Sequence, residues 1–212
     1  MAARFLVISF QRSGLNWLRH CTEYFSGIRT PGRPQLIESG PVLFDRAHDV
    51  RRGTIRTDYA GLYDSNGAEI YQRVAVLLRD PLDCFTSHYL GRADMNFKKA
   101  LGKFTAYSVN ILEFDRLVQA RKGVFYFEDF VNDETGTFEF LRFFGIDIAN
   151  RDYDFAALIA ASREWYRGTH GLFGKRERPQ LKRRQRAAIC EMLRQQLGDR
   201  FEQYLGRYSL DG

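Results

Sequence analysis

The sequence predicts an α/β fold, a single domain in which a central parallel sheet is flanked by helices. Two observations support this class: short apolar runs that resemble buried strands, and helical patterns that lie between and after them. The apolar runs are nearly continuous rather than alternating, which is typical of parallel strands covered on both faces. Strands and helices therefore alternate along the chain, as in α/β proteins with right-handed crossovers.

The expected elements can be placed in chain order. The strands are the apolar runs Arg4–Phe10, Val42–Phe44, Arg73–Leu78 and Val124–Phe127. The helices follow from apolar residues at helical spacing and cover Leu15–Phe25, Leu82–Leu90, Ala106–Ala120 and Thr135–Phe144. Gly145 is expected to end the last of these, because glycine often stops a helix. A final helix is indicated by apolar residues on one face, at Ile189, Leu193, Leu197 and Phe201.

Composition limits the class of protein. Of the 212 residues, 44% are hydrophobic and 15% aromatic, which excludes a disordered tail or a disulfide-stapled miniprotein. No repeat or linker divides the chain, so residues 1–212 are expected to form one domain. The 32 Lys and Arg outnumber the 26 Asp and Glu, for a formal net charge of +6. A basic surface suits an anionic ligand, whether a nucleotide, a sulfated or phosphorylated substrate, a nucleic acid or a membrane.

Cysteine and histidine spacings argue against disulfides and metal sites. The 3 cysteines form no C-x-x-C pair and the 4 histidines no H-E-x-x-H pattern, so we expect reduced thiols and no metal. The apolar run near the N-terminus is too short for a signal peptide, and no segment approaches the ~20 apolar residues that span a membrane. A soluble, cytoplasmic protein without a membrane span is expected.

The first strand leads into a segment suited to phosphate. Residues Gln11–Trp17 form a turn with a glycine at the start of a helix, where backbone N–H groups and the helix dipole favour an anion. Arg12, Ser13 and Asn16 add charge and side-chain donors. The segment is not a Walker A loop, because G-x-x-x-x-G-K-[ST] is absent. An ordinary strand–helix connection capped by Ser13 explains it equally well.

A second turn with charged residues follows the strand Arg73–Leu78. Asp80 is a suitable N-cap, and proline follows it at the first helical position. Arg79 then lies at the carboxyl end of a strand and Ser87 about two turns into the helix, where both could bind one phosphate. The alternative for Arg79 is a structural ion pair with Asp83.

Together the two turns resemble the sulfotransferases, which transfer a sulfuryl group from 3′-phosphoadenosine 5′-phosphosulfate (PAPS). The motif R-S-G-x-x-W covers Arg12–Trp17, and R-D-P-x-D-x-x-x-S-x-Y covers Arg79–Tyr89. The resemblance implies a P-loop-like phosphate site, with the first loop on the 5′-phosphosulfate and Arg79 and Ser87 on the 3′-phosphate. A weaker similarity extends over Val124–Gly145.

The resemblance implies a set of residues that hold the donor. From the first loop these are Arg12, Ser13, Gly14, Leu15, Asn16 and Trp17. The family's loop often reads K-S-G-T-T-W, so arginine replaces lysine here, and leucine and asparagine replace the two threonines. Leu15 offers only its backbone N–H, while the arginine still suits phosphate oxygens. Trp17 would stack on or wall the adenine, with a core tryptophan as the equally good alternative.

Three further residues are suggested by the same resemblance. Phe127 occupies the place of an adenine-contacting tyrosine, and Arg167 and Gly168 are the best match to a late R-K-G-x-x-G loop on the 3′-phosphate. The basic run Lys175–Arg186 is better explained by a solvated helix face than by a nucleic-acid site, so no nucleic-acid partner is expected.

Histidine is the natural proton acceptor near neutral pH. Many sulfotransferases carry a K-x-H segment after the second strand, and Arg46-Ala47-His48 is similar to it. His48 is therefore the expected catalytic base, with Arg12 stabilising charge on the leaving phosphate. His20 and His88 are expected to be structural.

These expectations describe a sulfotransferase that acts on a hydroxyl or amine of a small-molecule or glycan acceptor. The segments Ser26–Gly40 and Arg51–Ala68 are the expected acceptor loops. A small-molecule kinase shares the architecture but requires a Walker A loop. A non-catalytic basic protein that binds nucleotides or polyanions is the alternative from another class, with salt-dependent polymer binding as its mark.

Overall fold

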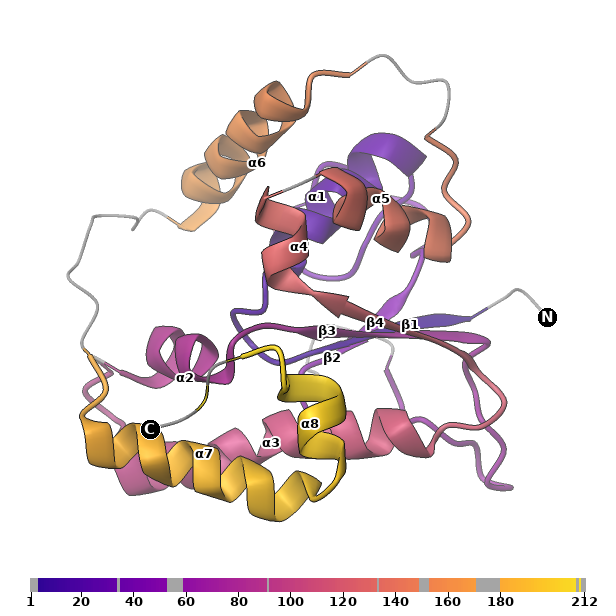
Figure 1. Ribbon diagram of the computed structural model, residues 1–212. Helices are drawn as coiled ribbons and strands as arrows, with labels where there is room; N and C mark the ends of the chain where they lie inside the picture. Colours follow the sequence, from indigo (N-terminus) through magenta and orange to yellow (C-terminus); the bar gives the residue numbers. More distant parts are fainter. Residues whose placement is uncertain are drawn as a thin grey trace.

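The computed structural model describes residues 4–33, 35–52, 59–90, 92–132, 134–148, 153–170, 180–208 and 210. The fold is α/β, as predicted, with a central sheet whose four strands are all parallel (Figure 1). The strands are β1 (Phe5–Ser9), β2 (Asp45–Ala47), β3 (Arg73–Leu78) and β4 (Arg121–Tyr126), in the order β2-β1-β3-β4. The carboxyl ends of the strands therefore meet at one edge of the sheet.

The predicted strands match β1 and β3 closely, while the prediction for the second strand was wrong. The range Val42–Phe44 lies just before β2, and Val42 forms only an isolated bridge with Arg29. β2 itself begins with two charged residues, Asp45 and Arg46, so hydropathy does not reveal it. The Tyr71 hydroxyl donates to the Asp45 carboxylate over 2.8 Å, which satisfies that charge in the sheet.

The helices include two that the sequence analysis did not predict, α4 and α6. They are α1 (Leu15–Ser26), α2 (Pro81–Tyr89), α3 (Phe97–Arg116), α4 (Phe127–Asn132), α5 (Glu134–Phe143), α6 (Phe155–His170), α7 (Arg183–Leu197) and α8 (Arg200–Leu205). α3 begins earlier than expected because Asn96 caps it, accepting from the amide of Lys99 over 2.9 Å. The final apolar stripe spans two helices, since α7 ends at Gly198.

Helices cover both faces of the sheet, as the hydrophobic strands predict (Figure 1). Leu6 and Ile8 of β1 belong to a core shared with α2, α3, α7 and α8. Val7 points to the other face, into a core shared with α1, α4, α5 and α6. Among the described helices, none is both long and apolar enough to cross a membrane.

Candidate functional site

The segments that follow the strands meet at the carboxyl edge of the sheet. The loop with Arg12 follows β1, His48 follows β2, Arg79 follows β3, and Phe127 follows β4. Arg79 connects two of these segments directly, because its Nη1 donates to the carbonyl oxygen of Arg12 over 3.0 Å. Open α/β sheets bind their ligands at this edge.

The loop after β1 has a left-handed backbone at two positions. Arg12 has φ 71° and Gly14, the N-cap of α1, has φ 85°. A positive φ is uncommon for arginine and shows that the loop is held in a specific shape. The Arg12 side chain is exposed at the loop. The amides of Gly14, Leu15 and Asn16 stand at the opening of α1, where amides lack acceptors within the helix.

Ser13 is turned into the protein. Its hydroxyl donates to the carbonyl oxygen of Phe10 over 2.7 Å, its backbone amide bonds to the same oxygen over 3.3 Å, and its side chain is buried. The Oγ atom also lies 3.7 Å from Cys84 Sγ. Ser13 therefore stabilises the turn through its bonds to Phe10, which agrees with the alternative of an ordinary strand–helix connection. It does not cap α1, however, as that alternative had expected.

The next two loop residues are held by α1 itself. Leu15 is buried in the core, so it presents only its backbone to the loop. The side-chain oxygen of Asn16 accepts from Arg19 Nη1 over 3.2 Å, which leaves its amide nitrogen as a donor. Arg19 is fully buried and also donates to Thr30 Oγ1 over 3.0 Å.

Trp17 packs between helices, which favours the alternative of a core tryptophan. Its Nε1 donates to Thr137 Oγ1 of α5 over 3.1 Å. Its ring meets Phe155 of α6 edge-on at 5.7 Å and stacks against His20 at 6.3 Å. The indole is partly buried in the core beneath α5 and α6.

Arg79 forms the structural ion pair with Asp83 that the sequence analysis gave as the alternative to phosphate binding. Its Nη2 donates to Asp83 Oδ2 over 2.9 Å, one turn into α2. The Nε atom is buried without a hydrogen-bond partner. Tyr107 fixes the backbone at this point, donating its hydroxyl to the Arg79 carbonyl over 2.6 Å. The guanidinium is thus held in place while its buried Nε–H makes no hydrogen bond.

Phe127 lies between Arg79 and the loop after β1. The Arg79 guanidinium lies 4.4 Å from the centre of the Phe127 ring, within the range of a cation–π interaction. The ring also fills the space beside Gly14, where a Cβ atom would lie 2.6 Å from Phe127 Cε2 and closer still to Cδ2. The ring thus packs on protein and forms one wall of the loop.

Ser87 lies one turn beyond Asp83 and is half-buried. On α2, a hollow of about 560 Å³ opens between this helix and the start of α7. The residues that line it are Asp80, Leu82, Asp83, Thr86, Gln180, Leu181 and Arg186. The hollow therefore borders the Arg79–Asp83 pair, and it has the size of a small-molecule site.

His48 directly follows the last paired residue of β2 and is oriented by β1. Its Nδ1 lies 2.7 Å from the carbonyl oxygen of Ser9 and 3.5 Å from Ser9 Oγ. Since a carbonyl only accepts, Nδ1 carries the proton, and Nε2 holds a lone pair. Burial lowers the pKa of His48 to about 4 against the raising effect of the Ser9 bond, and Arg46 and Arg19 lower it further.

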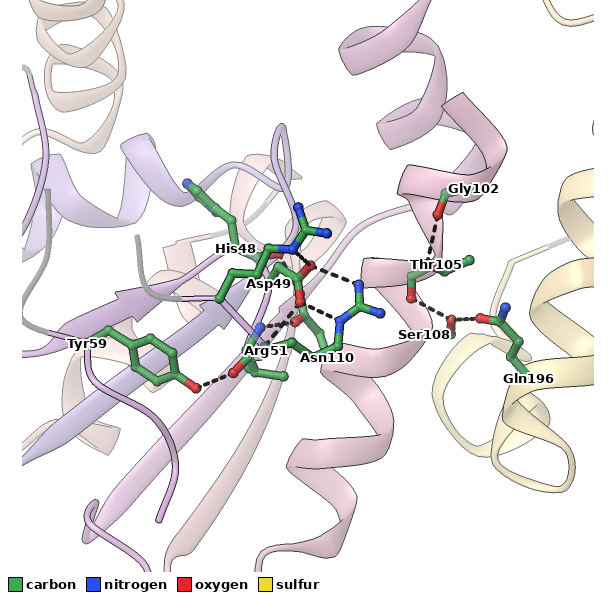
Figure 2. A network of polar contacts seen from close by, with 11 residues as sticks. His48, Asp49, Arg51, Tyr59, Gly102, Thr105, Ser108, Asn110 and Gln196 are labelled. Atoms are coloured by element: carbon green, nitrogen blue, oxygen red, sulfur yellow. Dashed lines mark hydrogen bonds and ion pairs between the residues drawn. The ribbon is translucent and has the colours of Figure 1, made fainter. Parts of the chain in front are cut away.

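A residue from α3 holds the turn that carries His48. The buried Asn110 donates from Nδ2 to the carbonyl oxygen of His48 over 2.9 Å and accepts the amide of Val50 over 3.0 Å. Figure 2 shows these bonds and the neighbouring pair of Asp49 and Arg51, which are joined over 2.9 Å. No local motif marks Asn110, so sequence analysis did not find it.

His88, for which the sequence analysis expects a structural role, packs among aromatic rings near this site. Its ring meets that of Phe10, the residue after β1, edge-on at 5.7 Å. Burial lowers the pKa of His88 to about 4, and Arg12, Arg92, His48 and Lys103 lower it further. His88 therefore shares an electrostatic environment with the expected base and with the loop arginine.

The segment that the sequence analysis matched to a late phosphate-binding loop is in part helical. Arg167 and Gly168 belong to the last turns of α6, and residues 171–179 lie outside the described part of the chain. The side chains of Arg167 and Gly168 lie outside the described part of the structure, so their expected role at the 3′-phosphate stays a prediction. The end of the basic run, Arg183–Arg186, forms the first turn of α7.

Comparisons with known proteins add no relative. No protein-family model matches the chain, and no curated protein is significantly similar to it. Within the part of the chain that the structure describes, no three His, Cys, Asp or Glu side chains gather in a way that could hold a metal ion.

Proposed function

We propose that this protein is a PAPS-dependent sulfotransferase that acts on a hydroxyl or amine of a small-molecule or glycan acceptor. The observation that carries the proposal is the meeting of Arg12, His48 and Arg79 at the carboxyl ends of three neighbouring strands. These are the residues that the two motifs and the R-x-H segment single out independently. We also propose a cytoplasmic setting, in keeping with the three buried free cysteines.

The residues present suit a donor with phosphate and sulfate groups. The opening amides of α1 and the exposed Arg12 provide donors and positive charge on one side of Phe127. On its other side, Arg79 holds its buried Nε without a partner, as expected of a group that awaits an anion. An anion there would compete with Asp83 for the guanidinium.

Each residue then has a defined task. Bound PAPS would supply the sulfuryl group, with 3′,5′-adenosine bisphosphate as the leaving group. His48 takes the proton of the acceptor on Nε2, since Nδ1 is fixed on Ser9. Arg12 and the loop amides stabilise the negative charge that develops on the leaving phosphate. The transfer is in line, so positioning and charge stabilisation account for the catalysis.

The low pKa of His48 has a direct consequence for this task. With a pKa of about 4, the imidazole is neutral near pH 7 and ready to accept a proton. The nearby arginines lower its basicity in the unliganded protein. A polyanion bound at the neighbouring loop adds negative charge to the site, so we expect the pKa of His48 to rise when the donor site is filled.

The test is a calorimetric titration with 3′,5′-adenosine bisphosphate beside one with ATP and Mg²⁺. We expect micromolar or tighter binding of the bisphosphate, lost in Arg79→Ala. Arg73→Ala is the matched control, because Arg73 lies at the opposite end of β3 and bonds to the carbonyl of Phe143 over 2.7 Å. Preferential binding of ATP with Mg²⁺ would instead favour a kinase, and binding of neither would overturn the proposal.

The non-catalytic alternative predicts a different result. A basic polyanion-binding protein would bind a sulfated polymer in a strongly salt-dependent way and would not require Arg79 or His48. Polymer binding that is unchanged in Arg79→Ala and His48→Ala, without bisphosphate binding, would support that alternative.

A further inference from the structure

The peptide group that joins Arg79 to Asp80, directly after β3, is held on both sides. The Tyr107 hydroxyl donates to its carbonyl oxygen over 2.6 Å, and its amide donates to Glu128 Oε1 over 3.1 Å. Tyr107 belongs to α3 and Glu128 to α4, so two helices fix the plane of this one peptide. Because that plane sets the backbone angle on the C-terminal side of Arg79, it determines the position from which the arginine side chain extends.

The other oxygen of the Glu128 carboxylate is held by a residue that follows α8. The Tyr208 hydroxyl donates to Glu128 Oε2 over 2.9 Å. Burial raises the pKa of Tyr208, and the negative charge of Glu128 raises it further, so the hydroxyl stays protonated and donates. With one oxygen on the Asp80 amide and the other on Tyr208, the carboxylate cannot turn without breaking a charge-assisted hydrogen bond.

The segment that carries Tyr208 is anchored at the end of β4. Arg207 donates to both oxygens of the Asp129 carboxylate over 2.8 and 2.6 Å, and its guanidinium lies 4.2 Å from the centre of the Tyr126 ring. On the other side of Tyr208, Leu210 is buried in the core shared with α2 and α3. Tyr208 therefore lies between two anchored residues, which limits the positions that its hydroxyl can take.

Glu128 connects Tyr208 to two residues of the proposed donor site. Arg79 begins the peptide that Glu128 holds, and Phe127 directly precedes Glu128 in the chain. The Arg79 guanidinium lies 4.4 Å from the centre of the Phe127 ring, and this ring fills the space beside Gly14. A displacement of the Glu128 carboxylate would therefore disturb the Arg79 backbone and the Phe127 wall of the loop together.

Resting on the proposed function, we propose that Tyr208 is a positioning residue of the donor site. It acts through Glu128: the hydroxyl keeps the carboxylate on the Asp80 amide, and this bond keeps Arg79 where an anion can bind. Without the hydroxyl, the arrangement that binds the donor becomes one of several that the protein samples. The affinity for the donor then falls in proportion to the fraction of molecules in the competent arrangement.

Tyr208→Phe tests this inference, because it removes the hydroxyl and keeps the ring. We expect the affinity for 3′,5′-adenosine bisphosphate in calorimetry to fall about tenfold, as when the competent fraction drops to about one tenth. The amide of Asp80 gives a second readout that requires no ligand. Its hydrogen exchange, followed by NMR and corrected for the global stability measured in urea, should be faster in Tyr208→Phe than in the unaltered protein.

Tyr204→Phe is the matched control, because the Tyr204 hydroxyl also donates to a carboxylate, that of Asp115, over 2.8 Å. This bond lies at the opposite end of β4, where the Asp115 carbonyl accepts from Lys122 over 2.9 Å. We expect Tyr204→Phe to lose stability in urea, while the bisphosphate affinity and the corrected exchange of the Asp80 amide stay unchanged.

Unchanged exchange of the Asp80 amide in Tyr208→Phe, an unchanged bisphosphate affinity in that variant, or equal effects of the two tyrosine variants would each overturn the inference. If the unaltered protein does not bind the bisphosphate, the proposed function fails. Faster exchange at Asp80 confined to Tyr208→Phe would then still support the positioning of the Arg79 backbone by Tyr208 and reject the donor. The failure of one proposal is therefore distinguishable from the failure of the other.

Discussion

The side-chain amide of Asn110 donates to the carbonyl oxygen of His48 over 2.9 Å, and its oxygen accepts the amide of Val50. The helix α3 thus determines where the proposed base stands. Asn110→Ala leaves a buried carbonyl and a buried amide without partners, at a cost of about 1–3 kcal/mol each. We expect a loss of stability in urea, a lower kcat and little change in bisphosphate affinity.

The role of Asn110 in positioning His48 has its own readout. In Asn110→Ala, the Nδ1 bond of His48 to Ser9 should loosen. Because this bond raises the pKa of His48, the NMR titration of His48 should move further below the ordinary histidine range. A purely structural effect would lower stability and leave the pKa of His48 unchanged, which would contradict a positioning role.

His48→Ala should abolish turnover while the binding of 3′,5′-adenosine bisphosphate survives. The imidazole takes the proton of the acceptor, and its described side-chain contacts are with Ser9, at the end of β1, rather than with the loop that follows. Turnover is measured with radiolabelled PAPS and binding by calorimetry. Retained turnover would remove His48 from the role of base.

The pH dependence of stability follows from the two histidines. The pKa values of His48 and His88 are lowered to about 4 from 6.5, so the unfolded chain binds protons between these values that the folded protein does not. The free energy of unfolding should therefore fall as the pH decreases from 6.5 toward 4. Urea denaturation across this range measures the slope. His48→Gln should reduce the slope, and the rest should persist because His88 remains; an unchanged slope would contradict the assignment.

Gly14→Ala tests the contact between the loop and Phe127. The new Cβ would meet the Phe127 ring, and the φ of 85° adds strain of about 1–3 kcal/mol. Gly27→Ala is a close control, since Gly27 has φ 68° and nothing within 4 Å of its Cβ position. We expect both variants to lose stability in urea, with a larger loss and weaker bisphosphate binding only for Gly14→Ala. Equal losses of stability in the two variants would show that the Phe127 ring can move away from the new Cβ atom at no measurable cost.

Glu23→Gln tests the buried cluster behind the loop. The Glu23 carboxylate lies 3.8 Å from Arg19 and accepts the amides of Thr30, Leu36 and Ile37 over 3.0, 2.5 and 3.1 Å. Its neutralisation leaves a buried arginine uncompensated, which costs about 3–5 kcal/mol. Glu113→Gln, in an exposed pair with Arg116, should change the free energy of unfolding by less than about 1 kcal/mol.

The sequence predicts the fold well where hydropathy decides it. β3 and the proline-started helix α2 were predicted because an apolar run meets a capping aspartate, and Asp80 does accept from the amides of Leu82 and Asp83. β2 was misplaced because two charged residues open it. α4 was missed because Phe127 continues the apolar pattern of β4 without a break. α6 was missed as well, since its segment was interpreted as leading into a late loop.

Of the candidate site, the sequence predicts only those residues that belong to a local motif. Arg12 and Arg79 were found because each follows an apolar strand, and strand ends meet in a parallel sheet. His48 was found through the resemblance of Arg46-Ala47-His48 to a family segment, although the strand before it was misplaced. Asn110 and His88 reach the site through packing between distant segments, which no spacing reveals. The inward direction of the Ser13 hydroxyl likewise depends on the fold of the loop.

The Phe127 ring against Gly14 also bears on how the protein folds. β1 is the first strand in the sequence and lies inside the sheet. Phe127, which packs against the loop after β1, directly follows β4, the edge strand that pairs with β3. Pairings so distant in sequence form slowly, because chain entropy is lost before contacts are gained. The loop can therefore reach its binding shape only after the last strand has docked. The rate at which anion affinity recovers during refolding would therefore report how fast the whole sheet is completed.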